Sequence, residues 1–264
     1  MVQHLIEEPE CDYFTSGAWG SSSAKRALVS IRAAKDMFDN KDMITSPSFA
    51  LGTAWDRMLT GVGEWAERPE GLNARTKDGQ TWLKEQAAND VQIVDAKQAL
   101  TIRTMRERMP AALVDIIKGA RCQMVSRACS PGGTPIQARY DAVTPTAIVD
   151  IKTTGKPIED FPRQCVIYGY DFQAAWYRFV WKLASGEDAP PFHFLVSETI
   201  SPYRTVLFQP DDEFYRIGME KVAAALTRID RARAIACWDD DGLPVRTLIL
   251  PKWAEMKQDD DEGF

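Results

Sequence analysis

The chain is 264 residues long, 45% of them hydrophobic, and carries a formal net charge of −6. This is enough apolar material for one large folded domain, and it excludes a disordered chain. The acidic balance excludes indiscriminate binding of nucleic acid through a basic surface, but not an enzyme whose metal ligands are themselves acidic.

The sequence gives no sign of a membrane or secreted protein. It contains no run of about 18 apolar residues, and its first residues lack the basic and apolar parts of a signal peptide. We therefore expect a cytoplasmic protein with no membrane partner. The five cysteines form no C-x₂-C pair, and only His4 and His193 are histidines. Ordinary reduced thiols are expected, and a histidine-rich metal site or a histidine-based hydrolytic triad is not.

The first part of the chain is expected to be mostly helical, after a loop at residues 13–20. Capping residues and hydrophobic periodicity predict helices over residues 23–39, from 46 through 59, and over 78–89, 95–109 and 111–119. A polar link separates the second and third of these helices. Pro110 ends the fourth, because proline cannot continue a helix.

The sequence pattern changes after residue 120, where strands are predicted in place of helices. Strands are predicted over residues 122–128, 135–143, 147–153, 191–198 and 203–208. Helices are predicted over residues 161–183 and 211–237. We expect one domain over residues 1–264, with a helical section (1–120), an α/β core (121–237) and a C-terminal tail (238–264).

Two carboxylates and a lysine stand out in one predicted hairpin. Asp141 lies on its first strand, and the β-branched second strand runs directly into Asp150-Ile-Lys152. Residues two apart on a strand share a face, so Asp150 and Lys152 point the same way. Burying such groups costs several kcal/mol unless they are paired or bind a metal. The pattern indicates a metal-dependent phosphodiesterase; the alternative is a half-exposed hairpin whose Asp and Lys merely pair.

A polar pair follows in the long, aromatic-rich helix. Gln173 and Tyr177 are four residues apart and therefore lie on one face of that helix. They are either a structural hydrogen-bonded pair or part of the same site. Asp56 lies beside Trp55 on an otherwise apolar helix face. It either belongs to the site or lies on the surface.

Taken together, these residues resemble the PD-(D/E)XK nuclease superfamily. The chain is most similar to phage and prophage recombination exonucleases of the RecE (exonuclease VIII) type, relatives of the RecB nuclease domain and of lambda exonuclease. The resemblance rests on the hairpin and the Gln173-x-x-x-Tyr177 helix, and extends to three earlier segments. These are Ser21-Ser-Ser23, Leu51-Gly-Thr-Ala-Trp-Asp56 and Arg75-Thr-Lys-Asp-Gly79. It implies a restriction-endonuclease-like α/β fold, a mixed central sheet flanked by helices.

The resemblance also implies roles for these residues. Asp141 and Asp150 would bind one or two Mg²⁺, or Mn²⁺ in its place, with the Ile151 carbonyl and Asp56 as further ligands. Lys152 would orient or help deprotonate the attacking water. Gln173 and Tyr177 would steady that lysine or touch a DNA phosphate. The chain departs from the family twice, with Asp56 where a histidine is usual and no acid in residues 122–126.

Contacts with DNA are expected from polar residues outside the hairpin. Ser21, Ser23, Lys25 and Arg26 lie near a predicted helix N-terminus, which can bind a phosphate at the DNA 5′ end. For the two serines, plain N-capping is the alternative. Arg75 and Lys77 belong to a loop that is often basic in the family.

By resemblance, the function is Mg²⁺-dependent degradation of linear double-stranded DNA from its 5′ ends, leaving 3′ single-stranded tails for recombination. The expected partners are double-stranded DNA ends, further copies of the chain in a ring, and a single-strand annealing protein. Two alternatives remain open. One is a nuclease of the RecB or CRISPR-adaptation kind that acts on single strands, and the other is a catalytically impaired DNA-binding protein of the same fold.

Overall fold

The computed structural model describes residues 4–40 and 46–240 of the chain. Its centre is a five-stranded sheet whose strands follow one another in chain order from β3 to β7. They are β3 (Arg121–Cys129), β4 (Pro135–Val143), β5 (Ile148–Thr154), β6 (Phe192–Glu198) and β7 (Thr205–Phe208). β5 and β6 run parallel, and the other neighbouring pairs are antiparallel. This mixed sheet confirms the expected fold class.

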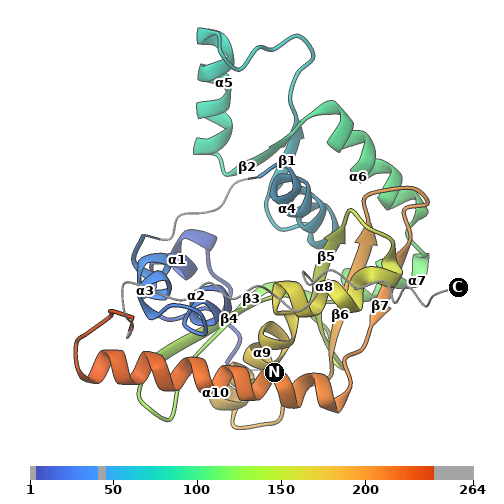
Figure 1. Cartoon of the computed structure of the whole chain (residues 1–264). Helices are drawn as coiled ribbons and strands as arrows, with labels where there is room; N and C mark the ends of the chain where they lie inside the picture. The colour runs from blue at the N-terminus through green and yellow to red at the C-terminus, as the bar shows by residue number, and fades with distance from the viewer. Residues whose placement is uncertain (1–3, 41–45, 241–264) are drawn as a thin grey trace, which may run out of the picture.

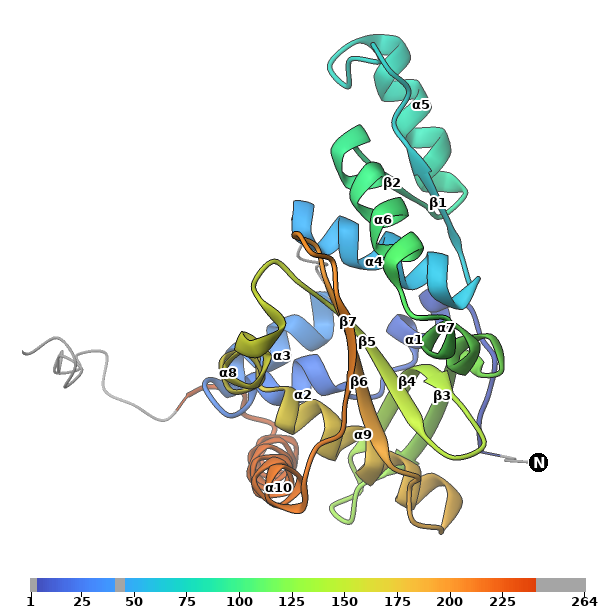
Figure 2. The same cartoon turned by 90° about the vertical axis from the view of Figure 1, so that its right-hand side faces the viewer.

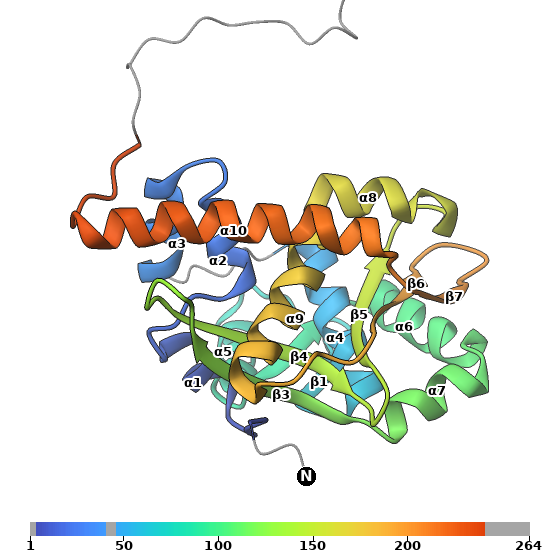
Figure 3. The same ribbon diagram turned by 90° about the horizontal axis from the view of Figure 1, so that it is seen from below.

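Helices cover both faces of the sheet (Figure 2). One face carries α9 (Tyr170–Ser185), with the long α10 (Asp212–Ala234) packed across it (Figure 3). The other face carries α4 (Pro47–Thr60), α6 (Ala96–Arg108) and α7 (Ala111–Lys118). The sheet therefore separates two hydrophobic cores, a larger one around α9 and a smaller one under α4.

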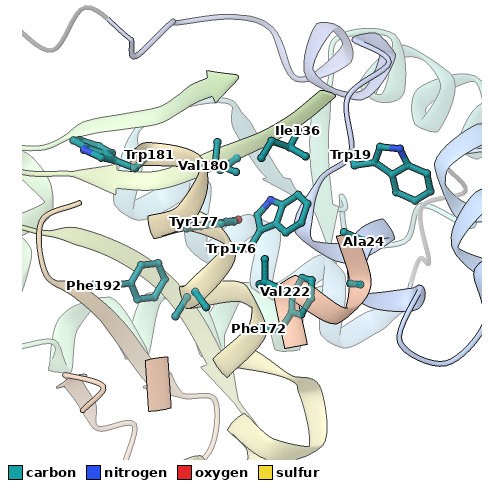
Figure 4. Packing of buried hydrophobic residues seen from close by; sticks show 14 of the residues in the cluster. Trp19, Ala24, Ile136, Phe172, Trp176, Tyr177, Val180, Trp181, Phe192 and Val222 are labelled. Atoms are coloured by element: carbon teal, nitrogen blue, oxygen red, sulfur yellow. The ribbon is translucent and has the colours of Figure 1, made fainter. Parts of the chain in front are cut away.

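The larger core forms around α9 because one side of this helix is aromatic. Phe172 and Trp176, four residues apart, are completely buried (Figure 4). Trp176 Nε1 donates a hydrogen bond to the carbonyl oxygen of Gln137 at 2.9 Å, so the indole is buried without an unpaired donor. α10 approaches α9 most closely at Gly218, where an added Cβ would lie 2.2 Å from the carbonyl oxygen of Asp171. A side chain there would push the two helices apart.

A small lobe extends beyond α4, away from the sheet (Figure 1). It consists of β1 (Glu64–Glu67), α5 (Lys77–Ala88) and β2 (Val91–Val94), with β1 and β2 parallel. Arg57 of α4 holds its base, donating to the Glu64 carbonyl at 2.8 Å and to Asp90 Oδ1 at 2.9 Å. The sequence predicted no strand here. Four-residue, half-exposed strands carry too little alternation to be detected.

The helix predicted over residues 161–183 is divided in two. α8 (Phe161–Tyr168) ends at Gly169, which takes a φ of 65° before α9 begins. Glycine reaches this left-handed region without steric cost, and helices commonly end that way. The space beside Gly169 is filled by Lys25, whose Cδ would lie 2.8 Å from an added Cβ. The turn therefore sets where Lys25 sits.

The helix predicted over residues 23–39 is also divided, into α2 (Ser21–Arg26) and α3 (Ile31–Asn40). A new helix begins because Ser30 and Asp240 satisfy its free N–H groups. The Ser30 hydroxyl accepts from the backbone of the first turn at 2.9 Å, and Asp240 Oδ1 accepts from the first residue of α3 at 2.6 Å.

The N-terminal segment is fastened to the edge of the sheet. Ile6 forms an isolated bridge with Val125, and Trp19 forms another with β4. Between them lies α1 (Glu10–Thr15), so the loop predicted over residues 13–20 begins inside a helix. A six-residue helix is too short for periodicity to reveal it.

The predicted tail, residues 238–264, is described only as far as residue 240; residues 241–264 lie outside the described residues. Trp238 stacks on Trp19 with ring centroids 5.8 Å apart, so the start of this segment packs on the fold. All five cysteines are free thiols, as expected. Within residues 4–40 and 46–240, no helix is long and apolar enough to cross a membrane.

A buried carboxylate joins the loops at one end of the sheet. Glu198, at the end of β6, is completely buried. Its Oε1 accepts from the Ile158 N–H at 2.7 Å, and its two oxygens accept from the Arg204 guanidinium at 2.6 and 3.1 Å. These hydrogen bonds from Arg204 lower the pKa of Glu198. The carboxylate thus ties the loop after β5 to the turn before β7.

We expect Glu198→Ala to lower the free energy of unfolding by about 2 kcal/mol at neutral pH, because it leaves the Ile158 N–H without its acceptor and leaves Arg204 paired with Glu159 alone. Glu213→Ala is the matched control, since Glu213 pairs with Arg216 on the exposed face of α10, where an ion pair contributes little. Urea unfolding measures both. Because folding lowers the pKa of Glu198, its contribution is present above about pH 4.3 and is lost as the pH falls further. Equal losses in the two variants would contradict this account.

Candidate active site

The predicted Asp150-Ile-Lys152 lies on β5 in the middle of the sheet. Asp150 is 1% exposed, and its Oδ2 forms an ion pair with Lys152 Nζ. Gln173 Nε2 on α9 donates to Asp150 Oδ1 at 2.8 Å and lies 3.3 Å from the Tyr177 hydroxyl. The Lys152 ammonium also lies 5.2 Å from the centre of the Tyr170 ring. The half-exposed hairpin is therefore wrong, because Asp150 is buried, the Lys152 side chain is only 17% exposed, and Gln173 holds Asp150 from α9.

Asp141 is joined to the same strand by its side chain. The paired residues of β4 and β5 are Ala142–Val149 and Val143–Ile148. Just beyond them, Asp141 Oδ2 accepts the Ile151 N–H at 2.8 Å. A carboxylate thus serves as the acceptor for a strand N–H, which places Asp141 beside Asp150. Ile151 contributes its N–H here; the ligand role predicted for its carbonyl stays a prediction.

Asp56 reaches this region from the opposite layer, on α4. Its Oδ2 accepts from Gln123 Nε2 of β3 at 2.8 Å, while its Oδ1 is shielded from solvent and has no hydrogen-bond partner among the described residues. Gln123 Oε1 in turn accepts from Arg139 Nε of β4 at 2.8 Å. The surface position considered for Asp56 is wrong, because one of its oxygens is bonded to the sheet and the other is shielded from solvent.

The backbone of Gln123 is strained. Its φ is +54°, in the left-handed region, although it lies within β3. Pairing of β3 with β4 continues on both sides of it, with Cys122 opposite Ala142 and Met124 opposite Tyr140. A non-glycine residue in this region costs on the order of 1 kcal/mol, and such outliers cluster at functional sites.

The three carboxylates have raised pKa values. Burial raises the pKa of Asp56, and the charge of Asp141 raises it further. Burial likewise raises the pKa of Asp141, and it raises that of Asp150 to about 7 although the Lys152 charge opposes it. Burial alone would lower the pKa of Lys152, but the charges of Asp150 and Asp141 raise it. Lys152 is therefore an ammonium ion at neutral pH.

The donors suit a hard divalent cation. All three side chains offer carboxylate oxygens, the ligands preferred by ions such as Mg²⁺ and Mn²⁺. The unpartnered Oδ1 of Asp56 and the raised pKa values are both signs of negative charge that a cation would stabilise. Other oxygens of these carboxylates already accept hydrogen bonds from Lys152, Gln173 and Gln123. Among the described residues, no group of three His, Cys, Asp or Glu residues is arranged so that it could hold a metal ion as it stands. The fit therefore rests on the donor chemistry and the orphaned oxygen.

Of the predicted DNA-binding residues, Lys25 is the one whose charge interacts with that of Lys152. Its Nζ donates to the Tyr168 carbonyl; burial, followed by the positive charge of Lys152, lowers its pKa. Because α2 ends at Arg26, both cations lie at its C-terminal end, and their predicted place at a helix N-terminus is wrong. Plain N-capping by the serines is also wrong, because Gly20 is the N-cap residue, no side chain caps this helix, and Ser23 donates to the Gly20 carbonyl at 3.2 Å.

The remaining predicted residues are spread more widely. Ser21 is the first residue of α2 and is half-buried, and Arg26 is exposed at the end of that helix. Arg75 and Lys77 are exposed at the start of α5, in the lobe that extends away from the sheet (Figure 1). The fold thus places Lys25 within range of the Lys152 charge and leaves Arg75 and Lys77 on the separate lobe.

Two residues of the site were missed from the sequence. Arg139 lies two residues before Asp141 on a predicted strand, so alternation could have placed it on the same side. Gln123 carried no such signal, because its left-handed backbone and its contact with Asp56, 67 positions away, are properties of the fold.

Asp-x-Lys on one strand beside an aspartate of the strand before it is the arrangement after which the PD-(D/E)XK nucleases are named. The mixed sheet with helices on both faces is theirs as well, so the chain is a nuclease of this class, whose members depend on divalent metal ions. More specifically, it belongs to the family described as PDDEXK-like domain of unknown function (DUF3799), whose model matches residues 63–242. No curated protein sequence matches it.

Solved structures share the fold. A candidate exonuclease from Eubacterium rectale is 14% identical with a TM-score of 0.60, over 87% of each chain. A phage-related exonuclease from Haemophilus somnus is 17% identical over 69% of this chain and 95% of its own, with a TM-score of 0.31. An alkaline exonuclease from Laribacter hongkongensis is 15% identical over 69% and 94%, with a TM-score of 0.30. The first shows a common fold, and the other two scores are too low to bear on it.

Replacing Asp56 by Asn removes one of three neighbouring carboxylates. In EDTA we expect the unfolding temperature to rise by a few degrees, equivalent to about 1 kcal/mol, since burial and the Asp141 charge both disfavour ionised Asp56. Mn²⁺ should stabilise the native protein and stabilise this variant much less. Asp115→Asn, at an exposed ion pair with Lys118 on α7, is the control. A lower unfolding temperature in EDTA with an unchanged response to Mn²⁺ would show that Asp56 is structural.

Proposed function

We propose that the protein is a Mg²⁺-dependent exonuclease that hydrolyses linear double-stranded DNA from its 5′ ends and leaves 3′ single-stranded tails for recombination. Mn²⁺ is a second metal that the carboxylate donors would accept. The buried Asp150–Lys152 pair beside Asp141 carries the proposal. Such a pair is costly to bury, and a stable core could be built more cheaply from apolar residues. The 5′ polarity and the recombination role come from the resemblance to exonucleases of the RecE type.

The carboxylates and the lysine of the site have different roles in the proposed reaction. A divalent ion held by Asp141, Asp150 and Asp56 would lower the pKa of a bound water and neutralise the scissile phosphate. Lys152, kept protonated by its acidic neighbours, acts as a donor that orients the attacking water and stabilises charge on the phosphate oxygens.

Gln173 and Tyr177 act through Asp150. Gln173 holds one carboxylate oxygen of Asp150, and Tyr177 lies next to the same amide. Their position fixes the Asp150 carboxylate from the α9 side, instead of steadying Lys152 directly as the resemblance implied. Both are positioning residues in this proposal.

Binding of the DNA end is assigned to the Lys25 side of the site. The charge of Lys152 contributes to the lowered pKa of Lys25, which supports the proposal that both bind one phosphodiester segment. Arg26 adds an exposed charge next to Lys25. With a net charge of −6, the chain has little general attraction for DNA. A homo-oligomeric ring that encloses the duplex would retain it topologically, and a single-strand annealing protein is the proposed recipient of the 3′ tail.

The first test is cleavage by the purified protein with Mg²⁺. We expect digestion of linear duplex DNA but not of closed circles, with 5′-labelled nucleotides released first. Asp150→Asn and Lys152→Met should each slow it at least about 100-fold. Asp188→Asn and Lys182→Met are matched controls, since they alter an Asp–Lys pair that is exposed near the end of α9. Undiminished cleavage by both site variants would refute the site. Digestion of single strands alone would favour the RecB-like alternative, and DNA binding without cleavage would favour the impaired one.

The second test concerns Lys25. We expect Lys25→Gln to reduce the preference for a 5′-phosphorylated over a 5′-hydroxyl end by about tenfold, the worth of one charge-assisted hydrogen bond. Arg32→Gln on α3 is the control, because Arg32 is an exposed cation paired with Asp239. Single-turnover rates on the two duplexes measure the preference. An unchanged preference in the Lys25 variant would remove this residue from the end-binding site.

A further inference from the structure

The end of α8 presents apolar side chains to solvent. Val166, Ile167 and Tyr168 are 74%, 64% and 53% exposed. The same helix buries Phe161 and Cys165, four residues apart, on its inner side. A surface helix normally carries polar residues on its outer face, and while single exposed apolar residues need no explanation, three in succession do. This end of α8 is therefore a candidate contact surface.

Two neighbouring aromatic rings connect this surface to the active site. The Tyr168 ring lies against that of Tyr170, with the ring centroids 5.7 Å apart and an angle of 42° between the planes. The centre of the Tyr170 ring in turn lies 5.2 Å from the Lys152 ammonium. Lys25 reaches the same end of α8, because its Nζ donates to the Tyr168 carbonyl. A single aromatic ring therefore separates the exposed Tyr168 from Lys152.

The charged residues around this surface favour an anionic partner. Arg163 lies one turn before the apolar group and is exposed, and its guanidinium has no ion pair or hydrogen bond with another described residue. Lys25 adds a second positive charge at the end of the helix. Of the two acids at the start of α8, Glu159 is paired with Arg204. The other, Asp160, lies about 12 Å from the apolar end along the helix axis.

A nucleobase fits this combination of groups. Single-stranded nucleic acid binds where cations contact its phosphates and where aromatic or apolar side chains contact the faces of its bases. Within a duplex these faces are stacked on neighbouring bases, so an unpaired nucleotide is the partner that can offer one to Tyr168. Lys25, the proposed ligand of the DNA end, contacts the Tyr168 carbonyl, so a phosphate bound by this lysine would lie beside the ring.

We propose that Tyr168 stacks on an unpaired base of the DNA strand in the active site. Val166 and Ile167 extend the apolar contact, and Arg163 binds the phosphate backbone next to it. The inference rests on the proposed function, because it concerns the substrate strand of that same site. Every base has an aromatic face, so the contact holds the strand without reading its sequence.

The test compares the binding of two short single strands in EDTA, where no cleavage takes place. One is an oligothymidylate, and the other is an abasic strand of the same length with the same phosphates, so that the two differ in their bases alone. We expect the native protein to bind the oligothymidylate about tenfold more tightly, the worth of one stacked base. Tyr168→Leu should remove most of this preference, and Tyr168→Phe should keep it. Fluorescence anisotropy measures the affinities, and circular dichroism checks that each variant is folded.

Further variants separate contact with bases from contact with phosphates. Arg163→Gln should weaken the binding of both strands by the same factor and reduce its dependence on salt, because a phosphate contact is common to the two. Ile167→Ala should weaken the binding of the oligothymidylate alone. Leu100→Ala is its matched control, since Leu100 on α6 is an aliphatic side chain with the same exposure, 64%, and belongs to the opposite layer of helices. It should leave both affinities unchanged.

The outcomes separate this inference from the proposed function. An oligothymidylate that binds the native protein no better than the abasic strand, or not at all, would overturn the inference alone, while failure of the proposed function shows as absence of DNA cleavage with Mg²⁺. A preference left intact in Tyr168→Leu, together with a lower oligomeric mass in ultracentrifugation, would assign the surface to contact between copies of the chain and overturn it too. If Tyr168→Leu does not fold, Ile167→Ala decides, and binding of the oligothymidylate equal to that of Leu100→Ala would overturn the inference.

Discussion

The burial of Asp150 and Lys152 in the middle of β5 is the constraint around which the rest of the structure is arranged. Each charge would cost several kcal/mol to bury alone, and the pair is tolerated because Lys152 pairs with one oxygen of Asp150 while Gln173 donates to the other. Ile148 and Val149 anchor the preceding part of the strand between the two cores. The parallel pairing with β6 keeps β5 straight through Lys152. The fold thus holds the two charges at fixed positions within a paired strand.

Both layers of helices contribute to the same point. From one side, α9 buries Phe172 and Trp176 while its other face carries Gln173 to Asp150. The break at Gly169 lets this helix begin close to Lys25. From the opposite side, α4 buries Trp55 and directs the adjacent Asp56 toward the sheet. The site therefore lies where the sheet separates two cores, and its geometry depends on the packing of both.

The sequence predicted the parts of this site that depend on short-range patterns, and it missed those that depend on contacts between distant residues. The buried strand, its Asp-x-Lys pair and the helix with Gln173 are local patterns of period two and four, and they were recognisable. The partner of Gln173 was not, since Asp150 is 23 residues away and Lys152 was an equally good candidate. Asp56 could be placed on a helix but not on the side of the carboxylates. The role of Gln123 could not be predicted, because a polar residue in a strand normally indicates a face exposed to solvent.

The two departures from the family pattern are linked in space. The family usually has a histidine where this chain has Asp56, and an acid on the strand before the hairpin, where residues 122–126 contain none. Here Asp56 on α4 is hydrogen-bonded to Gln123 on that strand. A carboxylate therefore reaches β3 from α4. Within the described residues, one oxygen of this carboxylate is buried without a partner and Gln123 has a left-handed backbone, and costs of this kind are typical of functional sites.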